Sequence, residues 1–108
     1  MDDKSFIQEV MMRFRSHLKE ISSDHREAIL ESGRVFVSNS RLDLERWTGL
    51  LASGVLTKNE LEWLVRAKVD LAEMEALKQE GLTLARIDEL RAALAGAVTG
   101  AVMHVIGM

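Results

Sequence analysis

The chain of 108 residues contains no proline, no cysteine and no tyrosine. A β-rich or loop-rich fold of this length normally uses several prolines in its turns, so the lack of proline favours helices joined by short turns. Without cysteine the chain can form no disulfide, no thiolate zinc site and no cysteine nucleophile. Aromatic residues are also few, at 5%, so leucine, alanine, valine and methionine must fill most of the interior, as is typical of helix-on-helix packing.

The charge balance is slightly acidic, with a net charge of −3 at pH 7 and a pI near 5.6. A surface that tracks nucleic-acid phosphates needs a basic excess, so we expect no nucleic-acid partner. Basic and acidic residues alternate, and apolar residues make up 47% of the chain, which predicts one helical domain over residues 1–108. The acidic N-terminal residues lead directly into an amphipathic pattern without a signal peptide, so a cytoplasmic location is expected.

Apolar residues recur at helical spacing along most of the chain. This pattern predicts an all-α protein, a bundle of four or five helices. The expected helices cover residues 4–20, 24–37, 41–52, 57–80 and 83–106. Residues 34–37 are rich enough in strand-forming side chains for a short strand, but no partner strand is visible, and we assign them to a helix.

Capping patterns set several of these boundaries. Thr57 is followed three residues later by Glu60, the clearest capping box in the chain, and Ser5 with Gln8 has the same spacing. Gly54 is a suitable C-terminal cap for the third helix. The fourth and fifth helices, each about 36 Å long at 1.5 Å per residue, are separated by only a few residues, which predicts a long C-terminal antiparallel hairpin.

No pattern of catalytic or metal-binding residues is visible. None of His17, His25 and His104 has the glutamate three residues earlier that carboxylate-bridged di-metal sites require, and no two histidines are four residues apart. The seven glycines form no phosphate-binding loop, and the serines lie where helix capping explains them. We therefore expect a protein that is not an enzyme, with no catalytic residue, no metal and no cofactor.

Trp47 and Trp63 flank the turn at Gly54, within apolar stretches. We expect both indoles to be largely buried, closing one end of the core. The alternative is that Trp47 and Trp63 form an exposed patch for a protein partner, because tryptophan is enriched among the residues that dominate binding energies.

Methionine suits either an irregular core or an adaptable binding surface. Core positions are expected for Met11, Met12, Met74 and Met103.

Residues 92–108 carry no lysine, arginine, aspartate or glutamate. A small residue or spacer recurs there at every fourth position, and this small-residue row is Ala92, Gly96, Gly100 and His104. Larger residues lie on the roughly opposite face, because two residues turn a helix by about 200°. This larger row is Leu94, Val98, Val102 and Ile106. Each interior glycine costs the helix about 1 kcal/mol relative to alanine, and close contact with another helix would offset this cost. We therefore expect the larger row to pack into the core and the small-residue row to let a second backbone approach.

These observations predict a small, non-enzymatic assembly or adaptor protein that forms a homo-oligomer through its small-residue row. One alternative is a membrane-active or tail-anchored protein that inserts residues 92–108, although their span of about 25 Å is short of a bilayer core of about 30 Å. A second is a macromolecular binding module or inhibitor that uses an acidic helical face or a patch around the tryptophans. In a third alternative, a tryptophan or phenylalanine side chain of the same chain packs on the glycines of the last helix.

Overall fold

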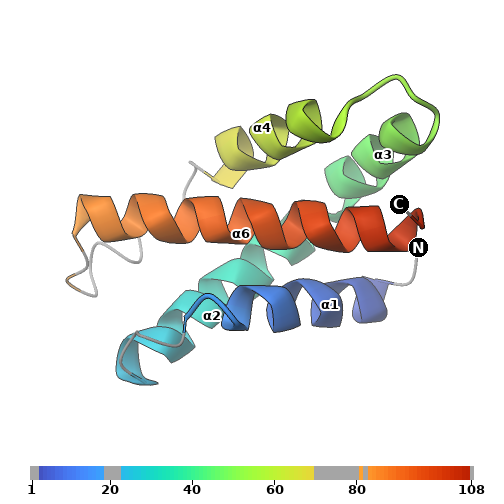
Figure 1. Cartoon of the computed structure of the whole chain (residues 1–108). Coiled ribbons are helices and arrows are strands. Elements are labelled where there is room, and N and C mark those ends of the chain that lie inside the picture. Colours follow the sequence, from blue (N-terminus) through green and yellow to red (C-terminus); the bar gives the residue numbers. More distant parts are fainter. Residues whose placement is uncertain (1–2, 19–22, 70–80, 82, 108) are drawn as a thin grey trace.

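The computed structural model describes residues 3–18, 23–69, 81 and 83–107, and these contain five helices and no strand (Figure 1). The helices are α1 (Asp3–Arg15), α2 (Ser23–Asn39), α3 (Arg41–Ala52), α4 (Lys58–Val69) and α6 (Leu84–Val105). The prediction of an all-α bundle is therefore confirmed for this part of the chain.

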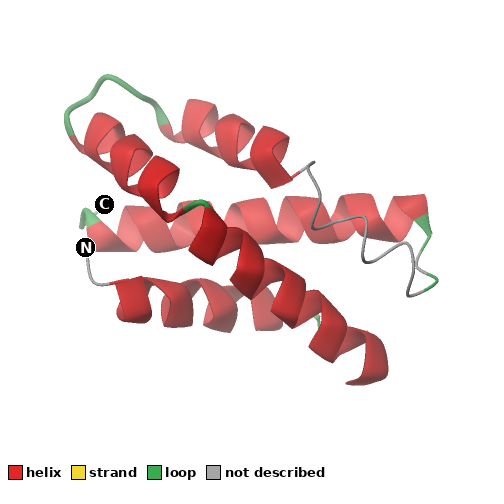
Figure 2. Ribbon diagram, turned by 180° about the vertical axis from the view of Figure 1, so that it is seen from behind, coloured by secondary structure: helices red, strands yellow, loops and turns green. Residues whose placement is uncertain are grey.

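Helix α6 is the centre of the arrangement. It packs against α1 along one side and against α4 along the other, and it runs antiparallel to both (Figure 1). Helix α2 packs on α1 and crosses behind α6, and α3 connects α2 to the layer of α4, as the view from behind shows (Figure 2). One long side of α6 is left uncovered by the described helices, and this side faces the viewer in Figure 1.

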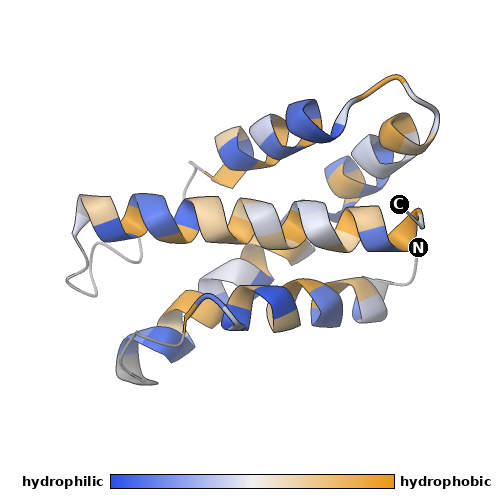
Figure 3. Ribbon diagram, in the orientation of Figure 1, coloured by the Kyte–Doolittle hydropathy of each residue, from blue (hydrophilic) through white to orange (hydrophobic). Residues whose placement is uncertain are grey.

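The buried face of α6 carries the larger row that the sequence pattern assigned to it. Leu94, Val98 and Val102 are fully buried, and Ile106 is half-buried. Charged residues concentrate in the N-terminal half of α6, whereas its C-terminal half is mostly apolar or near neutral in hydropathy (Figure 3). Each large side chain removed from water contributes about 1.5–3 kcal/mol, so the larger row holds α6 between its neighbours.

Gly33 lets α1 and α2 approach each other closely around Phe14. The Phe14 ring is buried, and a Cβ added at Gly33 would lie 2.9 Å from its Cε2 atom. That distance is shorter than real Cβ contacts, so a side chain at this position must push the ring away. The same Cβ would lie 3.5 Å from Leu94 Cδ1, which places Gly33 where three helices meet.

The capping box expected at the start of α4 is present in full. The Glu60 amide donates to Thr57 Oγ1 at 3.2 Å, and the Thr57 amide donates to Glu60 Oε1 at 3.0 Å. The bond from the Thr57 amide is the main cause that lowers the pKa of Glu60. Gly54 follows α3 with a φ of 83°, the left-handed conformation that a C-terminal glycine cap supplies. These local boundaries agree with the sequence prediction.

Helix α1 ends earlier than expected, and the prediction that it continues to residue 20 is wrong. It ends at Arg15, and the next residues form a tighter turn in which the His17 amide donates to the Phe14 carbonyl at 3.0 Å. The Ser16 hydroxyl donates to the Arg13 carbonyl at 2.7 Å. A serine side chain that occupies a backbone acceptor in this way competes with the continuation of the helix.

The other helix boundaries differ less from the prediction. Helix α1 begins at Asp3, so Ser5 lies inside it and does not cap it. Helix α2 includes the strand-like residues 34–37 and continues to Asn39. The expected end of the fourth helix, at residue 80, lies outside the described residues, and so does the connection that would set the length of the hairpin.

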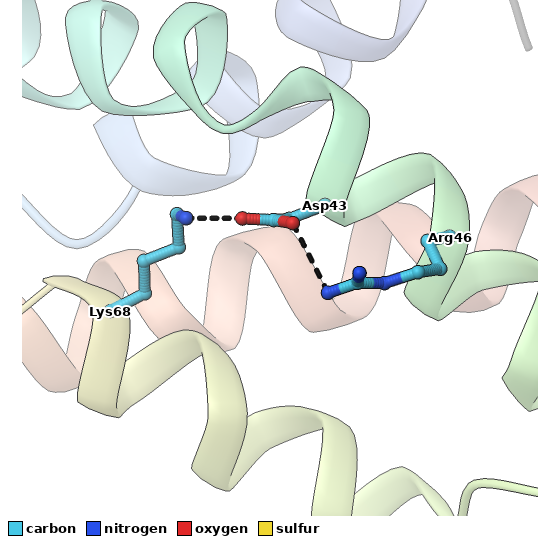
Figure 4. A network of polar contacts seen from close by, with 3 residues as sticks. All are labelled: Asp43, Arg46 and Lys68. Carbon is cyan, nitrogen blue, oxygen red and sulfur yellow. Dashed lines mark hydrogen bonds and ion pairs between the residues drawn. The ribbon is translucent and has the colours of Figure 1, made fainter.

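A polar contact joins α3 to α4 (Figure 4). The Asp43 carboxylate of α3 accepts a hydrogen bond from Lys68 Nζ of α4 and another, at 3.2 Å, from Arg46 Nη2 on its own helix. The hydrogen bond from Lys68, together with the charges of Lys68 and Arg46, lowers the pKa of Asp43 below its ordinary value. The contact therefore favours the ionised form of Asp43 and links two helices that are neighbours in sequence.

We expect the stabilisation from this contact to depend on pH. Because the pKa of Asp43 is lower in the folded protein than in the unfolded chain, the stabilisation is complete above the ordinary value of 3.8 and is lost as the pH falls through the lowered value. Urea unfolding of the wild type and Asp43→Asn across this range measures it. The wild type should be more stable at neutral pH, and the two stabilities should converge in acid. A difference that stays constant with pH would contradict the ionic contact.

Gly33→Ala should destabilise the protein, because the new Cβ meets the Phe14 ring, and overpacking of this kind costs about 1–3 kcal/mol. Gly49 provides a matched control, since it is an exposed glycine inside α3 where a Cβ would lie in open space. Gly49→Ala should stabilise the protein by about 0.5–1 kcal/mol through helix propensity. Chemical denaturation gives the sign of each change, and equal effects would argue against the close packing at Gly33.

Candidate functional site

The uncovered side of α6 forms the floor of an open groove, which we call the α6 groove. Its walls come from α1 and α4, and its volume is about 500 Å³. The lining residues are Arg13 of α1, Lys58 and Glu62 of α4, and Gly96, Thr99, Gly100, Met103 and His104 of α6. The groove thus contains three of the four residues of the small-residue row, and the fourth, Ala92, is half-buried and does not line it.

Gly96 lies in the α6 groove with nothing packed on it. It is exposed, and a Cβ added there would lie in open space, with no atom of a described residue within 4 Å. The described residues therefore give no packing reason for a glycine at this position. The alternative in which a tryptophan or phenylalanine of the same chain covers Gly96 is wrong.

Gly100 is covered by the side chain of Arg13. A Cβ added at Gly100 would lie 2.9 Å from Arg13 Nη1 and 3.4 Å from Arg13 Cδ. Glu9, one turn earlier in α1, holds this arginine, with 3.1 Å between Arg13 Nη2 and Glu9 Oε1. The small size of Gly100 thus lets an arginine, rather than an aromatic side chain, lie close to the α6 backbone.

The hydroxyl of Thr99 is an unpartnered polar group at the α6 groove. Thr99 is 2% exposed, and its Oγ1 atom is buried without a hydrogen-bond partner. Thr48 in α3 offers a comparison, because it is also buried but donates from Oγ1 to the Leu44 carbonyl at 2.6 Å. A buried polar group without a partner costs about 1–3 kcal/mol, and because Thr99 Oγ1 has almost no exposed surface, a molecule in the α6 groove does not reach it in this structure.

Both walls of the α6 groove carry charged residues, and their signs are mixed. Arg13 pairs with Glu9 on the α1 wall, and Lys58 and Glu62 lie on the α4 wall. His104 is exposed toward the C-terminal end of the floor. The sequence indicated Gly96, Gly100 and His104 of the floor by their spacing on one helix, but not Thr99 or Met103. It gave no sign of the wall residues, because only the packing of α1 and α4 on α6 brings them to the groove.

The two tryptophans lie in different surroundings. Trp47 is 8% exposed and belongs to the core as expected, whereas Trp63 is 71% exposed, so the prediction that it is buried is wrong. The buried row of α4 is Leu61, Val65 and Val69. Trp63 follows Leu61 by two residues and therefore lies on the roughly opposite face of the helix. Trp47 accordingly offers little exposed surface for a patch shared with Trp63.

A second groove lies between α1 and α2, and we call it the α1–α2 groove. Its volume is about 470 Å³, and its lining residues are Ile7, Gln8, Met11, Met12, Arg15 and Arg34. Met11 is buried as expected, but Met12 is 62% exposed, so the prediction that it fills the core is wrong. A single step along a helix turns the side chain by about 100°, which takes Met12 out of the core. Met103 is half-buried, and Met74 lies outside the described residues.

The part of the chain that the structure describes contains no group of three or more histidine, aspartate or glutamate side chains placed to hold a metal ion. His17 and His104 are exposed, and His25 is half-buried. Within the same residue ranges, no helix is both long enough and apolar enough to cross a membrane.

Removing one tryptophan at a time should separate their fluorescence. Trp47→Phe leaves Trp63 as the only emitter, and we expect emission close to that of free tryptophan with efficient quenching by acrylamide. Trp63→Phe leaves the buried Trp47, which should emit at shorter wavelength and resist quenching. Blue-shifted, poorly quenched emission from Trp47→Phe would show that Trp63 is covered.

Comparison with known proteins gives these surfaces no counterpart, because no protein-family model, no curated protein and no solved structure matches the chain. The features that bear on function are those of the chain itself, namely the α6 groove, the α1–α2 groove and the exposed Trp63.

Proposed function

We propose that this protein is a small, non-enzymatic assembly or adaptor protein of the cytoplasm that self-associates through the exposed face of α6. The observation that carries the proposal is the open space over Gly96, at the floor of the α6 groove, in a helix whose opposite face is buried. The proposed occupant of the groove is a second copy of the chain.

An exposed glycine inside a helix is unfavourable unless something uses the space that its missing side chain leaves. Gly96 costs α6 about 1 kcal/mol relative to alanine, and no neighbour in the part of the chain that the structure describes uses that space. A helix from a second copy can approach α6 more closely over Gly96 than over a larger residue, and the added van der Waals contact offsets the cost. Gly49 is equally open on α3, but it lines neither the α6 groove nor the α1–α2 groove.

The charges of the α6 groove also favour a second copy. In a two-fold symmetric contact the same patch meets itself, so a favourable patch carries groups of both signs. Arg13 and Lys58 supply positive charge to the groove, and Glu62 supplies negative charge.

Gly96→Leu should weaken self-association by at least about tenfold, equivalent to about 1.4 kcal/mol, because the leucine holds the two helix axes apart. Sedimentation equilibrium over a range of protein concentrations measures the change, and circular dichroism should show unchanged helical content. Gly49→Leu is the matched control, since it places the same side chain at another exposed helical glycine. This control should self-associate like the wild type.

Two results would argue against the proposal. A wild-type protein that stays monomeric at high concentration does not self-associate at all. Equal losses in Gly96→Leu and Gly49→Leu would place the contact away from α6. Gly100→Leu is less informative, because it displaces Arg13 and so disturbs the packing of α1 on α6.

Trp63 supports a second candidate function, a binding module for another macromolecule. It is 71% exposed and borders a depression of about 320 Å³ with Arg66, Ala67 and Arg91. Tryptophan is enriched among the residues that dominate binding energies. The emission of Trp47→Phe separates the two uses: a blue shift on oligomerisation assigns Trp63 to the self-association contact, and an unchanged spectrum leaves it open to another partner.

A further inference from the structure

The α1–α2 groove opens on a different flank of α1 from the α6 groove. Met12 lines the first groove and Arg13 lines the second, and consecutive residues point about 100° apart around a helix. A molecule bound in the α1–α2 groove therefore leaves the α6 groove open.

The floor of the α1–α2 groove is apolar and rich in methionine. Ile7 is half-buried and Met11 is buried, whereas Met12 stands 62% exposed. An exposed methionine beside other apolar side chains is typical of a binding surface, because its flexible thioether chain adapts to the partner. Gln8, Met12 and Arg15 follow one another at helical spacing, so the groove runs along about two turns of α1, or roughly 10 Å.

Among the described residues, the two charged groups that line the α1–α2 groove are arginines. Arg15 comes from α1 and Arg34 from α2, and no carboxylate lines the groove among the described residues. Arg34 pairs with Glu31 on its own helix at 3.4 Å, and both side chains are more than half exposed. Such an exposed pair adds little to stability, so Arg34 can exchange Glu31 for a carboxylate of a bound partner. Arg15 forms no ion pair with a described residue. This positive rim contrasts with the net charge of −3 of the whole chain.

We propose that the α1–α2 groove binds an amphipathic helix of a partner protein, one that carries acidic residues beside its apolar face. The apolar face packs on Met11 and Met12, and the carboxylates accept hydrogen bonds from Arg15 and Arg34. A helix in a groove of this kind anchors through residues at i, i+3, i+4 and i+7. The α6 groove carries both signs of charge and suits a second copy, whereas the single sign here favours an acidic partner. The proposal does not depend on self-association.

A synthetic helical peptide provides the probe. It contains leucines at i, i+3, i+4 and i+7, glutamates beside them and alanines elsewhere, and two matched peptides replace every glutamate by glutamine or by lysine. Titration of the full chain into each labelled peptide is followed by fluorescence anisotropy. The glutamate peptide should bind saturably, the glutamine peptide more weakly and the lysine peptide most weakly. Added salt should weaken binding of the glutamate peptide, because it screens the exposed arginines.

Charge reversal in the groove should change which peptide binds. Arg15→Glu/Arg34→Glu should weaken binding of the glutamate peptide by at least about tenfold and strengthen binding of the lysine peptide, because the complementary sign is reversed. Met12→Gln should weaken all three peptides while keeping their order. The matched control is Arg41→Glu/Arg86→Glu, which makes the same charge change at exposed residues of α3 and α6. Its affinities should stay within about twofold of the wild type, because neither residue lines the groove.

Several results would overturn the proposal: no saturable binding of the glutamate peptide, equal binding of the lysine peptide, or an equal loss in the control variant. Phosphatidylglycerol vesicles test a lipid surface instead. Cosedimentation that Arg15→Glu/Arg34→Glu abolishes, without binding of the glutamate peptide, would assign the groove to lipid. Circular dichroism checks the fold of each variant. If the double reversal unfolds, the effect of Met12→Gln on the glutamate peptide decides, and unchanged affinity rejects the groove.

Discussion

Burial of one face of α6 between α1 and α4 is the interaction on which the rest of the structure depends. Leu94, Val98 and Val102 are fully enclosed there, and each large side chain removed from water contributes about 1.5–3 kcal/mol. The helices that bury this face also become the walls of the α6 groove. Close packing at Gly33 then fixes α2 on α1, and the contact of Asp43 with Lys68 fixes α3 on α4. The grooves are therefore consequences of how the core is closed.

Glycines with the same appearance in the sequence have different surroundings in the fold. Gly33 makes room for the Phe14 ring, and Gly100 makes room for the Arg13 side chain. Gly96 makes room for none of the described residues, although its spacing from Gly100 gave the two glycines equal weight in the sequence. The residues packed around each glycine show whether it serves internal packing or lies on a free surface. Gly96 is therefore the better position of the pair for testing self-association.

Features set by local hydrogen bonds, or by the period of one helix, could be predicted from the sequence. The capping box of Thr57 needs only a glutamate three residues later, and the larger row of α6 needs only its own spacing. Features that depend on which helices pack together could not. Apolar residues surround most of α4, so the sequence pattern did not determine which side of this helix faces the core. The position of α6 decides that Trp63 faces outward. Gly96, Gly100 and His104 on the floor of the α6 groove were predictable in the same sense, whereas the positions of Arg13 and Glu62 at its walls were not.

Helix α1 supplies a wall to each of the two grooves, with Arg13 on one flank and Met12 on the other. A shift of α1 on α6 changes the width of the α6 groove, and it changes the α1–α2 groove only where α2 does not follow α1. Whenever occupation of one groove displaces α1 relative to both α2 and α6, it changes the affinity of the other, and thermodynamic linkage makes the two effects equal in size. Arg13 is the movable part of this connection, because a carboxylate entering the α6 groove competes with Glu9 for its guanidinium. If both grooves bind as proposed, α1 is the helix that couples the two binding events.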